Sequence, residues 1–492
     1  MSSILLLLTV LLPIVFAVVI RLLKVQGKVK EILNLIVVVI TSLLVLLLLV
    51  VPPTESFHIF DFNEKLNVSL KLDGIGKIFA GMVALLWPFA YLYAVGYMKG
   101  HDEKKNYSMF YVITYGVVLG ISFAANLITM YFFYELLTLV TIPLIIQPMS
   151  KEAKRATRYY LYISLFGSTL ALIGIIMLIH NFNTCDFVNV FSSDVSVYSS
   201  NSTLAQIAYL LMFFGFGVKA AIFPLHGWLP RAGVAPTPTT ALLHAVAVVK
   251  SGAFAIIRVI YSVIGVEVLS GTPAQIISMM FVAFTIVFGS SMALKQVHMK
   301  RRFAYSTVAN ISYILLAATM MSEFGLYAAM LHLLFHSFAK IAIFFVAGGL
   351  MHNANVNYVD QVDGLAKKMP VTFALYILAG LSIVGIPMFA GFISKWEIAN
   401  AAINVNTWYS YIGIAALLIS ALLTAIYVID IIIRAYFKKP NEYNAENYEV
   451  AHECNYKFIV PIAAFSILSL VLGLFATPLM ELLSSLLIGG GF

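Results

Sequence analysis

Long apolar segments recur along the whole chain, and they constrain its fold more than any other feature. Each has roughly the 20-residue length that a helix needs to cross a bilayer. The segments fall near residues 3–23, 32–52, 76–98, 107–125, 127–148, 155–180, 204–224, 237–262, 274–294, 303–321, 325–349, 371–403, 408–434 and 457–482. Hydrophobic residues make up 61% of the 492 positions, more than one soluble core can bury. The sequence therefore predicts an all-α polytopic membrane protein with about fourteen transmembrane helices.

Basic residues gather in alternate loops and predict the orientation. They are Lys24, Lys28 and Lys30; Lys99, Lys104 and Lys105; Lys151, Lys154 and Arg155; Lys300, Arg301 and Arg302; Lys367 and Lys368; and Lys438 and Lys439. The loops between them, such as 180–202, 263–273 and 404–407, contain no Lys or Arg. Because basic loops stay inside, we expect a multi-pass protein of the cell (cytoplasmic) membrane with both termini outside. The first apolar segment lacks a small-residue cleavage site, which favours a retained span over a signal peptide.

Two Gly- and Pro-rich interruptions break the apolar pattern. The first lies in GFGVKAAIFPLHGWLPRAGVAPTPTT, after Lys219, and the second is GIPMFAGFISKW, before Lys395. About five spans separate them, and an odd number predicts two inverted five-helix repeats with two broken helices. Paired interruptions of this kind mark transport sites, because unwound backbone must face protein or water. Two unrelated proline kinks are the alternative.

Glu135 and Lys219 are charges deep inside apolar segments. A lysine at the bilayer centre costs at least ~2.5–3.5 kcal/mol, so such groups face a protein interior or a watery cavity. Glu135 stands in a span with no other charge and must be paired or protonated, and Lys219 is the expected partner. A pair whose contact forms and breaks could transfer a proton to the next group. The alternative is a static ion pair that fixes helix packing.

Lys250 and Lys340 continue the series. His332, His336 and Lys340 are four residues apart, so they share one helical stripe. Imidazole can donate and accept protons near neutral pH, which suits a relay. For a membrane histidine a plain helix–helix hydrogen bond is the alternative. His244 lies on a different face from Lys250 but could line the same aqueous axis.

Most of the remaining charged residues are interpreted as structural. Asp430 and Arg434, four apart, predict an anchoring ion pair. Arg258 and the run MKRRFAYS are interpreted as interfacial charges, although Lys300 could mark a cytoplasmic uptake site for protons. Cys185 and Cys454 fall in loops on opposite sides, without CxxC spacing. No cofactor or metal site is expected, and the His332/His336 pair lacks a third ligand nearby in the sequence.

Several of these stretches together resemble one family. They are YELLTL, GVKAAIFPLHGWLPRAGVAPTPTTALLHAVAVVKSGAFAIIR, HMKRRFAYSTVANISYIL, FHSFAKIAIFFVAGG and GIPMFAGFISKW, which follow the family's order over roughly residues 70–435. They look like the antiporter-like subunits of respiratory complex I, Mrp-type cation/proton antiporters and membrane-bound hydrogenases. The residues of these stretches are most similar to those of the branch that holds the membrane-bound hydrogenases and the D-type subunits of Mrp antiporters. His298 departs from the pattern, since relatives usually carry an acid before the KR pair.

The resemblance implies both organisation and roles. Residues 107–262 and 274–434 would hold the two antiporter-like repeats, 1–106 three N-terminal helices with an external hairpin, and 435–492 a cytoplasmic loop with a C-terminal helix. The hairpin is predicted from the residues themselves, because FHIFDFNEKLNVSLKLDG alternates like two short paired strands. Proton translocation would use Glu135, Lys219, Lys250, His336, Lys340 and Lys395, with His226, His244, His332 and Lys300 as possible relay groups.

The expected function is that of a proton-translocating subunit of a multi-subunit membrane complex that couples redox chemistry, carried out in other chains, to ion pumping. The alternative is a component like the D-type subunits of Mrp-type sodium/proton antiporters, driven by ion gradients alone. A third possibility is a scaffold whose charges are inert. The expected partners are other membrane subunits, the lipid bilayer and protons, with sodium as a further candidate ion and no nucleic acid.

Overall fold

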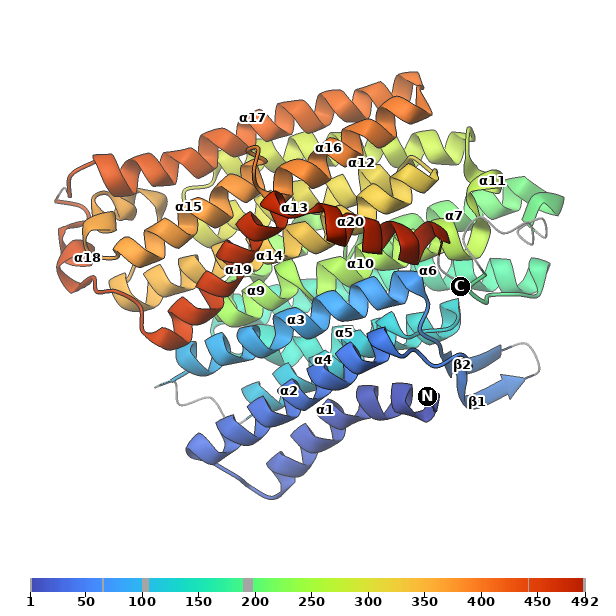
Figure 1. Cartoon of the computed structure of the whole chain (residues 1–492), viewed down its shortest axis with the longest axis horizontal. Helices are drawn as coiled ribbons and strands as arrows, with labels where there is room; N and C mark the ends of the chain where they lie inside the picture. Colours follow the sequence, from blue (N-terminus) through green and yellow to red (C-terminus); the bar gives the residue numbers. More distant parts are fainter. Residues whose placement is uncertain (1, 64–65, 100–105, 189–197, 441, 490–492) are drawn as a thin grey trace.

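The computed structural model describes residues 2–63, 66–99, 106–188, 198–440 and 442–489, and it is a bundle of roughly aligned helices (Figure 1). Lys104 and Lys105 of one predicted basic loop lie outside these residues. The first half contains α1 (Ile4–Leu22), α2 (Gly27–Val50), β1 (Phe57–Asn63), β2 (Leu66–Leu70), α3 (Gly74–Tyr97), α4 (Tyr107–Ser122), α5 (Leu127–Ile145), α6 (Lys151–Phe182), α7 (Ser202–Gly217), α8 (Trp228–Arg231), α9 (Thr237–Ala245) and α10 (Val248–Arg258). The second half contains α11 (Val266–Leu269), α12 (Pro273–Lys295), α13 (Met299–Thr319), α14 (Glu323–Ala354), α15 (Pro370–Val384), α16 (Ala390–Val405), α17 (Trp408–Phe437), α18 (Ala445–Val450), α19 (Tyr456–Leu474) and α20 (Thr477–Ser484).

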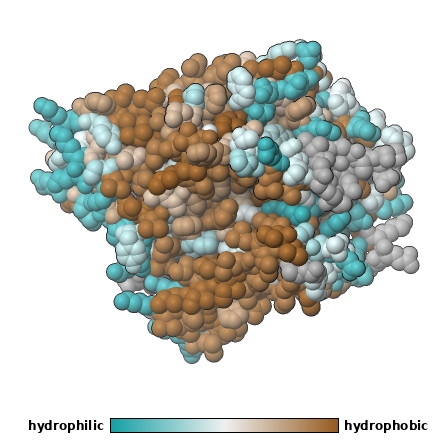
Figure 2. Space-filling model, in the orientation of Figure 1, coloured by the Kyte–Doolittle hydropathy of each residue, from teal (hydrophilic) through white to brown (hydrophobic). Residues whose placement is uncertain are grey.

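The helices have the length and composition of membrane spans. Within the described ranges, ten helices are long and apolar enough to cross a bilayer, and three shorter apolar helices accompany them. Every apolar segment of the sequence contains a helix, although three segments each resolve into two helices: 237–262 into α9 and α10, 371–403 into α15 and α16, and 457–482 into α19 and α20. The all-α membrane fold is thus confirmed, and the count of fourteen spans stays a prediction. On the face seen in Figure 2, apolar residues form a belt across the middle of the bundle, and polar residues gather towards its two ends.

Local sequence signals explain where many helices begin. Side chains of Asp73, Asn126, Ser150, Thr272 and Ser322 accept hydrogen bonds from backbone N–H groups of the first turns of α3, α5, α6, α12 and α14. Such caps satisfy donors that a helix start leaves open. Helix starts therefore follow from local chemistry, whereas helix packing follows from the buried faces.

The strands β1 and β2 pair antiparallel, which confirms the predicted hairpin. The hairpin lies at the same end of the bundle as the start of α1 and the end of the C-terminal helical segment Ser485–Gly489 (Figure 1). The described N- and C-terminal segments therefore reach one side of the apolar belt, in line with an even number of crossings. Which side this is stays a prediction.

Three helices are interrupted near the middle of the bundle. Between α7 and α9 the chain passes through a turn and the short helix α8, and residues 385–389 separate α15 from α16. The third break, at Val246 and Ala247 between α9 and α10, was not predicted, because no Gly or Pro marks it. There Ala247 N–H donates to the Leu242 carbonyl at 2.9 Å, an i to i−5 bond. Such widened turns recur at functional sites.

The two halves pack in corresponding ways. In the first, α4 packs on α5 and α6 on α7; in the second, α12 packs on α13 and α14 on α15 and α16. This agrees with two five-helix repeats, while their inverted relation and the four-part division of the chain stay predictions.

Ion pairs connect segments in two other parts of the bundle. Arg434 contacts Asp430 at 3.2 Å, which confirms the predicted pair, and it also contacts Asp363 at 3.2 Å. Arg258 is interpreted from the sequence as an interfacial charge, and its depth in the membrane stays a prediction. Its side chain is fully buried and forms a two-bond pair with Asp73 at 2.5 and 2.6 Å. The partner precedes α3, 185 residues away, so helix packing forms a pair that spacing could not suggest.

Candidate functional site

A lysine and a histidine meet at the centre of the bundle. Lys250 of α10 is fully buried, and its Nζ lies 2.8 Å from Nδ1 of His336 on α14. The same ammonium donates to the Leu333 carbonyl at 3.1 Å. When Lys250 is protonated, its ammonium donates this hydrogen bond and the imidazole nitrogen must accept it. One proton thus lies between two groups that can each hold it.

His332 extends this contact by one helical turn. Its ring stacks on that of His336 with centroids 5.7 Å apart, as the shared stripe predicts. Its Nδ1 lies 2.9 Å from the Ser394 hydroxyl of α16. In the part of the chain that the structure describes, no third metal-binding side chain joins the two rings.

Lys340 lies two helical turns from His332 on α14, in a polar cluster with neutral partners. Its Nζ donates to the Ser306 hydroxyl of α13 at 2.7 Å. The Tyr427 hydroxyl of α17 donates to the same oxygen at 2.7 Å. Ser306 therefore joins three helices, and as a hydroxyl it can both accept and donate.

Lys395 of α16 lies at the second break. Its Nζ donates to the carbonyls of Ile383 and Val384 at 2.8 and 2.9 Å. These carbonyls belong to the last turn of α15, which leaves acceptors open and carries partial negative charge. Gly391 permits the arrangement, because a Cβ there would lie 1.7 Å from the Ser382 carbonyl oxygen. The break thus supplies the acceptors for the lysine.

Lys219 and Glu135 approach each other without forming the predicted direct ion pair. Lys219 is fully buried and donates a short hydrogen bond to the Tyr134 carbonyl, with its Nζ 3.3 Å from the centroid of the Tyr134 ring. The carboxylate and ammonium still interact electrostatically. Oε1 of Glu135 is buried without a hydrogen-bond partner among the described residues. Tyr134 was missed by the sequence argument because a carbonyl acceptor leaves no signal in the side-chain pattern.

The side chains of α9, α10 and α13 connect these groups. Gly252 lets α10 lie against the Lys219 segment, since a Cβ there would be 2.9 Å from the Lys219 carbonyl carbon. His244 is fully buried beside Phe344 and interacts electrostatically with both Lys340 and Lys300. Nζ of Lys300 donates to the Ala235 carbonyl at 3.0 Å. His244 thus lies between the interior lysines and the start of α13.

Electrostatic interactions join Lys250, His332, His336, Lys340 and Lys395 into one set. Together with Lys219, whose backbone lies against Gly252 of α10, they are hereafter called the interior row. Lys250, Lys340 and Lys395 each interact with His336, and Lys340 also interacts with Lys250 and Lys395. His226 stays apart, its ring packed on those of Phe223 and Phe288. Among predicted relay groups, the structure brings His332 and His244 to the row but not His226.

Serines and a tyrosine of the cluster were missed from sequence. Ser306, Ser394 and Tyr427 are buried and bond the row or its partners. A weak signal exists, since each is a polar residue within an apolar helix, where a partner is needed. Which partner it finds depends on tertiary packing.

Sequence comparisons match most of this chain to known proteins. The sequence pattern of a family described as "NADH:quinone oxidoreductase/Mrp antiporter, TM" matches residues 124–424. NADH-quinone oxidoreductase subunit N of Desulforudis audaxviator is 32% identical over 425 residues, which cover 83% of this chain and 82% of that one. Na(+)/H(+) antiporter subunit A1 of Staphylococcus aureus is 28% identical over 437 residues, 83% of this chain but 53% of that one. The chain thus spans about half the length of that antiporter protein.

Two solved structures share the fold. One is a chain of the Mrp complex from Dietzia sp., with a TM-score of 0.85, 21% identity and coverage of 99% of this chain and 97% of that one. The other belongs to the membrane-bound sulfane sulfur reductase, an archaeal respiratory membrane complex, with a TM-score of 0.86, 21% identity and coverage of 99% and 98%. At this identity the likeness concerns the fold.

Proposed function

Because this chain belongs to the NADH:quinone oxidoreductase/Mrp antiporter family of membrane subunits, we propose that it carries protons along the interior row as one subunit of a larger membrane complex. The observation that carries the proposal is the contact between Lys250 and His336 at 2.8 Å. Two buried bases that share one proton can pass it between them when water or a third group approaches.

The neighbouring groups extend this exchange in both directions. Lys340, with Ser306 and Tyr427, offers a hydroxyl path towards the face at which α13 begins, where His244 and Lys300 also lie. Lys395 lies beside the second break and would serve as the boundary to the next subunit or to the opposite side. Buried ammonium groups repel one another, so protonating one lowers proton affinity at the next.

Glu135 and Lys219 form the proposed switch at the other end of the row. The two groups interact without a direct ion pair among the described residues, and Oε1 of Glu135 has no hydrogen-bond partner there, which fits a contact that can form and break. Closing the pair would favour the charged lysine, and opening it would release a proton towards Lys250.

In this proposal, other chains of the complex supply the free energy that drives proton movement. The relatives include a respiratory protein and an antiporter protein. We favour a complex in which redox chemistry elsewhere drives proton pumping, as the names of the NADH-quinone oxidoreductase relative and of the reductase complex suggest for those proteins. The second candidate, a sodium/proton exchanger driven by gradients, is favoured by the matches to the Na(+)/H(+) antiporter relative and the Mrp complex. The cytoplasmic membrane, with both termini outside, is the proposed location.

Purification of the native complex would separate the two, because its other subunits either do or do not include redox proteins. Reconstituted vesicles would then be energised by a reductant or by a sodium gradient while a pH dye reports proton movement. If neither the reductant nor the sodium gradient produced proton movement, both candidate functions would be contradicted.

The switch is tested by Glu135→Gln and Lys219→Ala in the same vesicles. Each should reduce proton movement several-fold while the protein stays in the complex, because the pair is proposed to act in exchange and not in assembly. Thr138→Ala, on the same helix, is the control. Loss of the protein from the membrane in both variants would instead support a structural clamp.

A further inference from the structure

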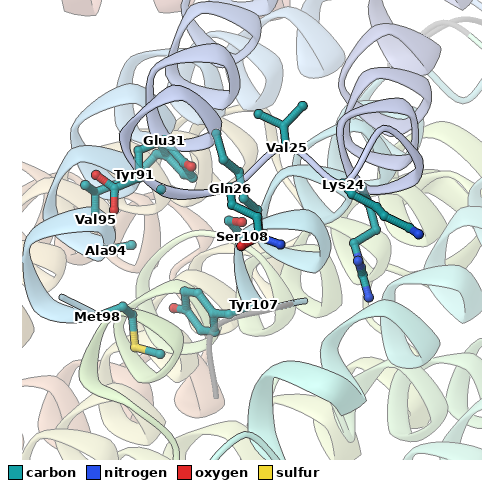
Figure 3. A pocket seen from close by; sticks show the side chains of 13 residues that line it. Lys24, Val25, Gln26, Glu31, Tyr91, Ala94, Val95, Met98, Tyr107 and Ser108 are labelled. Carbon is teal, nitrogen blue, oxygen red and sulfur yellow. The ribbon is translucent and has the colours of Figure 1, made fainter. Parts of the chain in front are cut away.

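A cavity of about 420 Å³ lies away from the interior row, where α1 turns into α2. The α1–α2 turn, the end of α3 and the first turn of α4 enclose it (Figure 3). Lys24 and Gln26 reach it from the turn, Tyr91 from α3, and Tyr107 and Ser108 from α4. Its size falls within the range of about 300–1,000 Å³ that is usual for small-molecule sites.

The described lining carries an excess of positive charge. It includes Arg21, Lys24 and Lys30 but one carboxylate, Glu31. Arg21 is held at the start of α4, because its Nε donates to the Asn106 side chain at 2.7 Å. Guanidinium and ammonium groups that converge on one cavity attract an anion, and a phosphate group accepts bonds from both.

Two helix N-termini add to this charge. The 24-residue helix α2 and the 16-residue helix α4 both begin at the cavity, and neither Gln26 nor Asn106 makes a side-chain cap hydrogen bond. Gly27 has φ of 63° and is exposed, so the backbone at the start of α2 is accessible there. Open N–H groups at a helix start bind anions.

A buried hydroxyl points to a ligand independently. Tyr91 is 1% exposed and lines the cavity, yet its hydroxyl has no hydrogen-bond partner of ordinary geometry among the described residues, although Asn34 lies near. The Ser108 hydroxyl of α4 is likewise unpartnered in this part of the chain. Buried polar groups are normally satisfied, so the Ser108 hydroxyl, and the Tyr91 hydroxyl beyond its interaction with Asn34, can each bond an acceptor that fills the basic cavity.

We propose that this cavity binds the phosphate of an anionic phospholipid from the adjoining leaflet. The surroundings favour a lipid over free phosphate, because large apolar side chains at the same turn are exposed: Leu22 at 73%, Leu23 at 71% and Val29 at 59%. Acyl chains of a lipid whose phosphate lies among Arg21, Lys24 and the start of α2 would cover these side chains. The basic loops place this turn on the predicted cytoplasmic side, where anionic lipid is attracted to Lys and Arg.

Native mass spectrometry of the intact complex tests the proposal. Delipidated complex is supplied with vesicles of phosphatidylglycerol or of phosphatidylcholine, and bound lipid is counted. The double variant Arg21→Gln/Lys24→Gln should bind phosphatidylglycerol roughly tenfold more weakly, because two cations near the headgroup are lost. Lys151→Gln/Lys154→Gln, exposed charges at the start of α6 that do not line the cavity, should bind as the unchanged complex does. Equal losses in the two double variants, or equal retention of both lipids by the unchanged complex, would overturn the proposal.

Two further arms separate the remaining explanations. Tyr91→Phe removes one hydroxyl and keeps the ring, so it should weaken phosphatidylglycerol binding without affecting assembly, and unchanged binding would exclude the hydroxyl from the site. Inorganic phosphate at millimolar concentration should leave the bound lipid in place. Displacement of the lipid by phosphate would identify the cavity as a site for the free anion and would contradict the lipid assignment.

Discussion

The buried arginines and the buried lysines of this protein have different partners. Arg258 binds Asp73 through two hydrogen bonds, and Arg302 binds Asp430 at 3.0 Å. The four lysines Lys219, Lys250, Lys340 and Lys395 instead donate to carbonyls, a hydroxyl or an imidazole. In the described ranges, no carboxylate lies within ion-pair distance of these lysines.

This difference follows from the chemistry of the two cations. Arginine keeps its proton at any physiological pH, so a buried arginine needs an opposite charge at all times. Lysine can lose its proton when buried, and a neutral acceptor suits both the ammonium and the amine. The arginine pairs are therefore interpreted as clamps and the lysine contacts as exchange sites. The variants of Arg258, Ser306 and Lys250 below test this contrast.

Breaking an arginine clamp should have the largest effect, on stability. Arg258→Ala leaves Asp73 as a partly buried charge without its partner and should lower the free energy of unfolding by about 3–5 kcal/mol. Thermal unfolding in detergent, followed by the yield of folded complex, measures this. Arg155→Ala, an exposed arginine of α6, is the control. If Arg258→Ala were as stable as the unchanged protein and folded with the same yield, the distinction between arginine clamps and lysine exchange sites would be contradicted.

Removing a neutral acceptor should instead reduce transport. Ser306→Ala takes away the oxygen that Lys340 and Tyr427 share, at a cost of about 1–3 kcal/mol for an unsatisfied buried donor. We expect roughly tenfold slower proton movement in assembled complexes. Ser312→Ala is the matched control, since that hydroxyl of α13 bonds the Val308 carbonyl of its own helix. Equal rates in the two variants would exclude Ser306 from the path.

The smallest effect is expected at His298, where the sequence departs from the family pattern. Burial, then the nearby Lys300 and Arg301, lower the pKa of the His298 imidazole to about 4. Its folded pKa lies below that of the unfolded chain, so the stability it contributes is lost as pH falls from about 6.5 towards 4.

Above that window His298 is neutral and exchanges no proton. His298→Gln should therefore leave the pH profile of proton movement unchanged from about pH 6.5 to pH 8. A profile shifted within that range, measured in reconstituted vesicles, would show that His298 takes part in proton uptake.

Much of this molecule could be predicted where local chemistry decides. Apolar segments mark the helices, FHIFDFNEKLNVSLKLDG marks the hairpin, and spacing of four gives the His332/His336 stack. Partners across helices could not be predicted, since Lys250 and His336 are 86 residues apart. The same holds for the Arg258–Asp73 pair. The break at Val246 was invisible because no Gly or Pro produces it; a widened hydrogen-bonded turn does.

Proton movement by reconstituted complexes carrying Lys250→Arg tests the central claim most directly. Arginine keeps the positive charge beside His336 but cannot give up its proton, so charge and exchange are separated. Assembly should be retained and proton movement lost across the neutral pH range. Lys250→Ala should also lose it, whereas a working Lys250→Ala would support an inert scaffold. If Lys250→Arg matched the unchanged complex, deprotonation of Lys250 would play no part in transport, and its role would be that of a fixed charge.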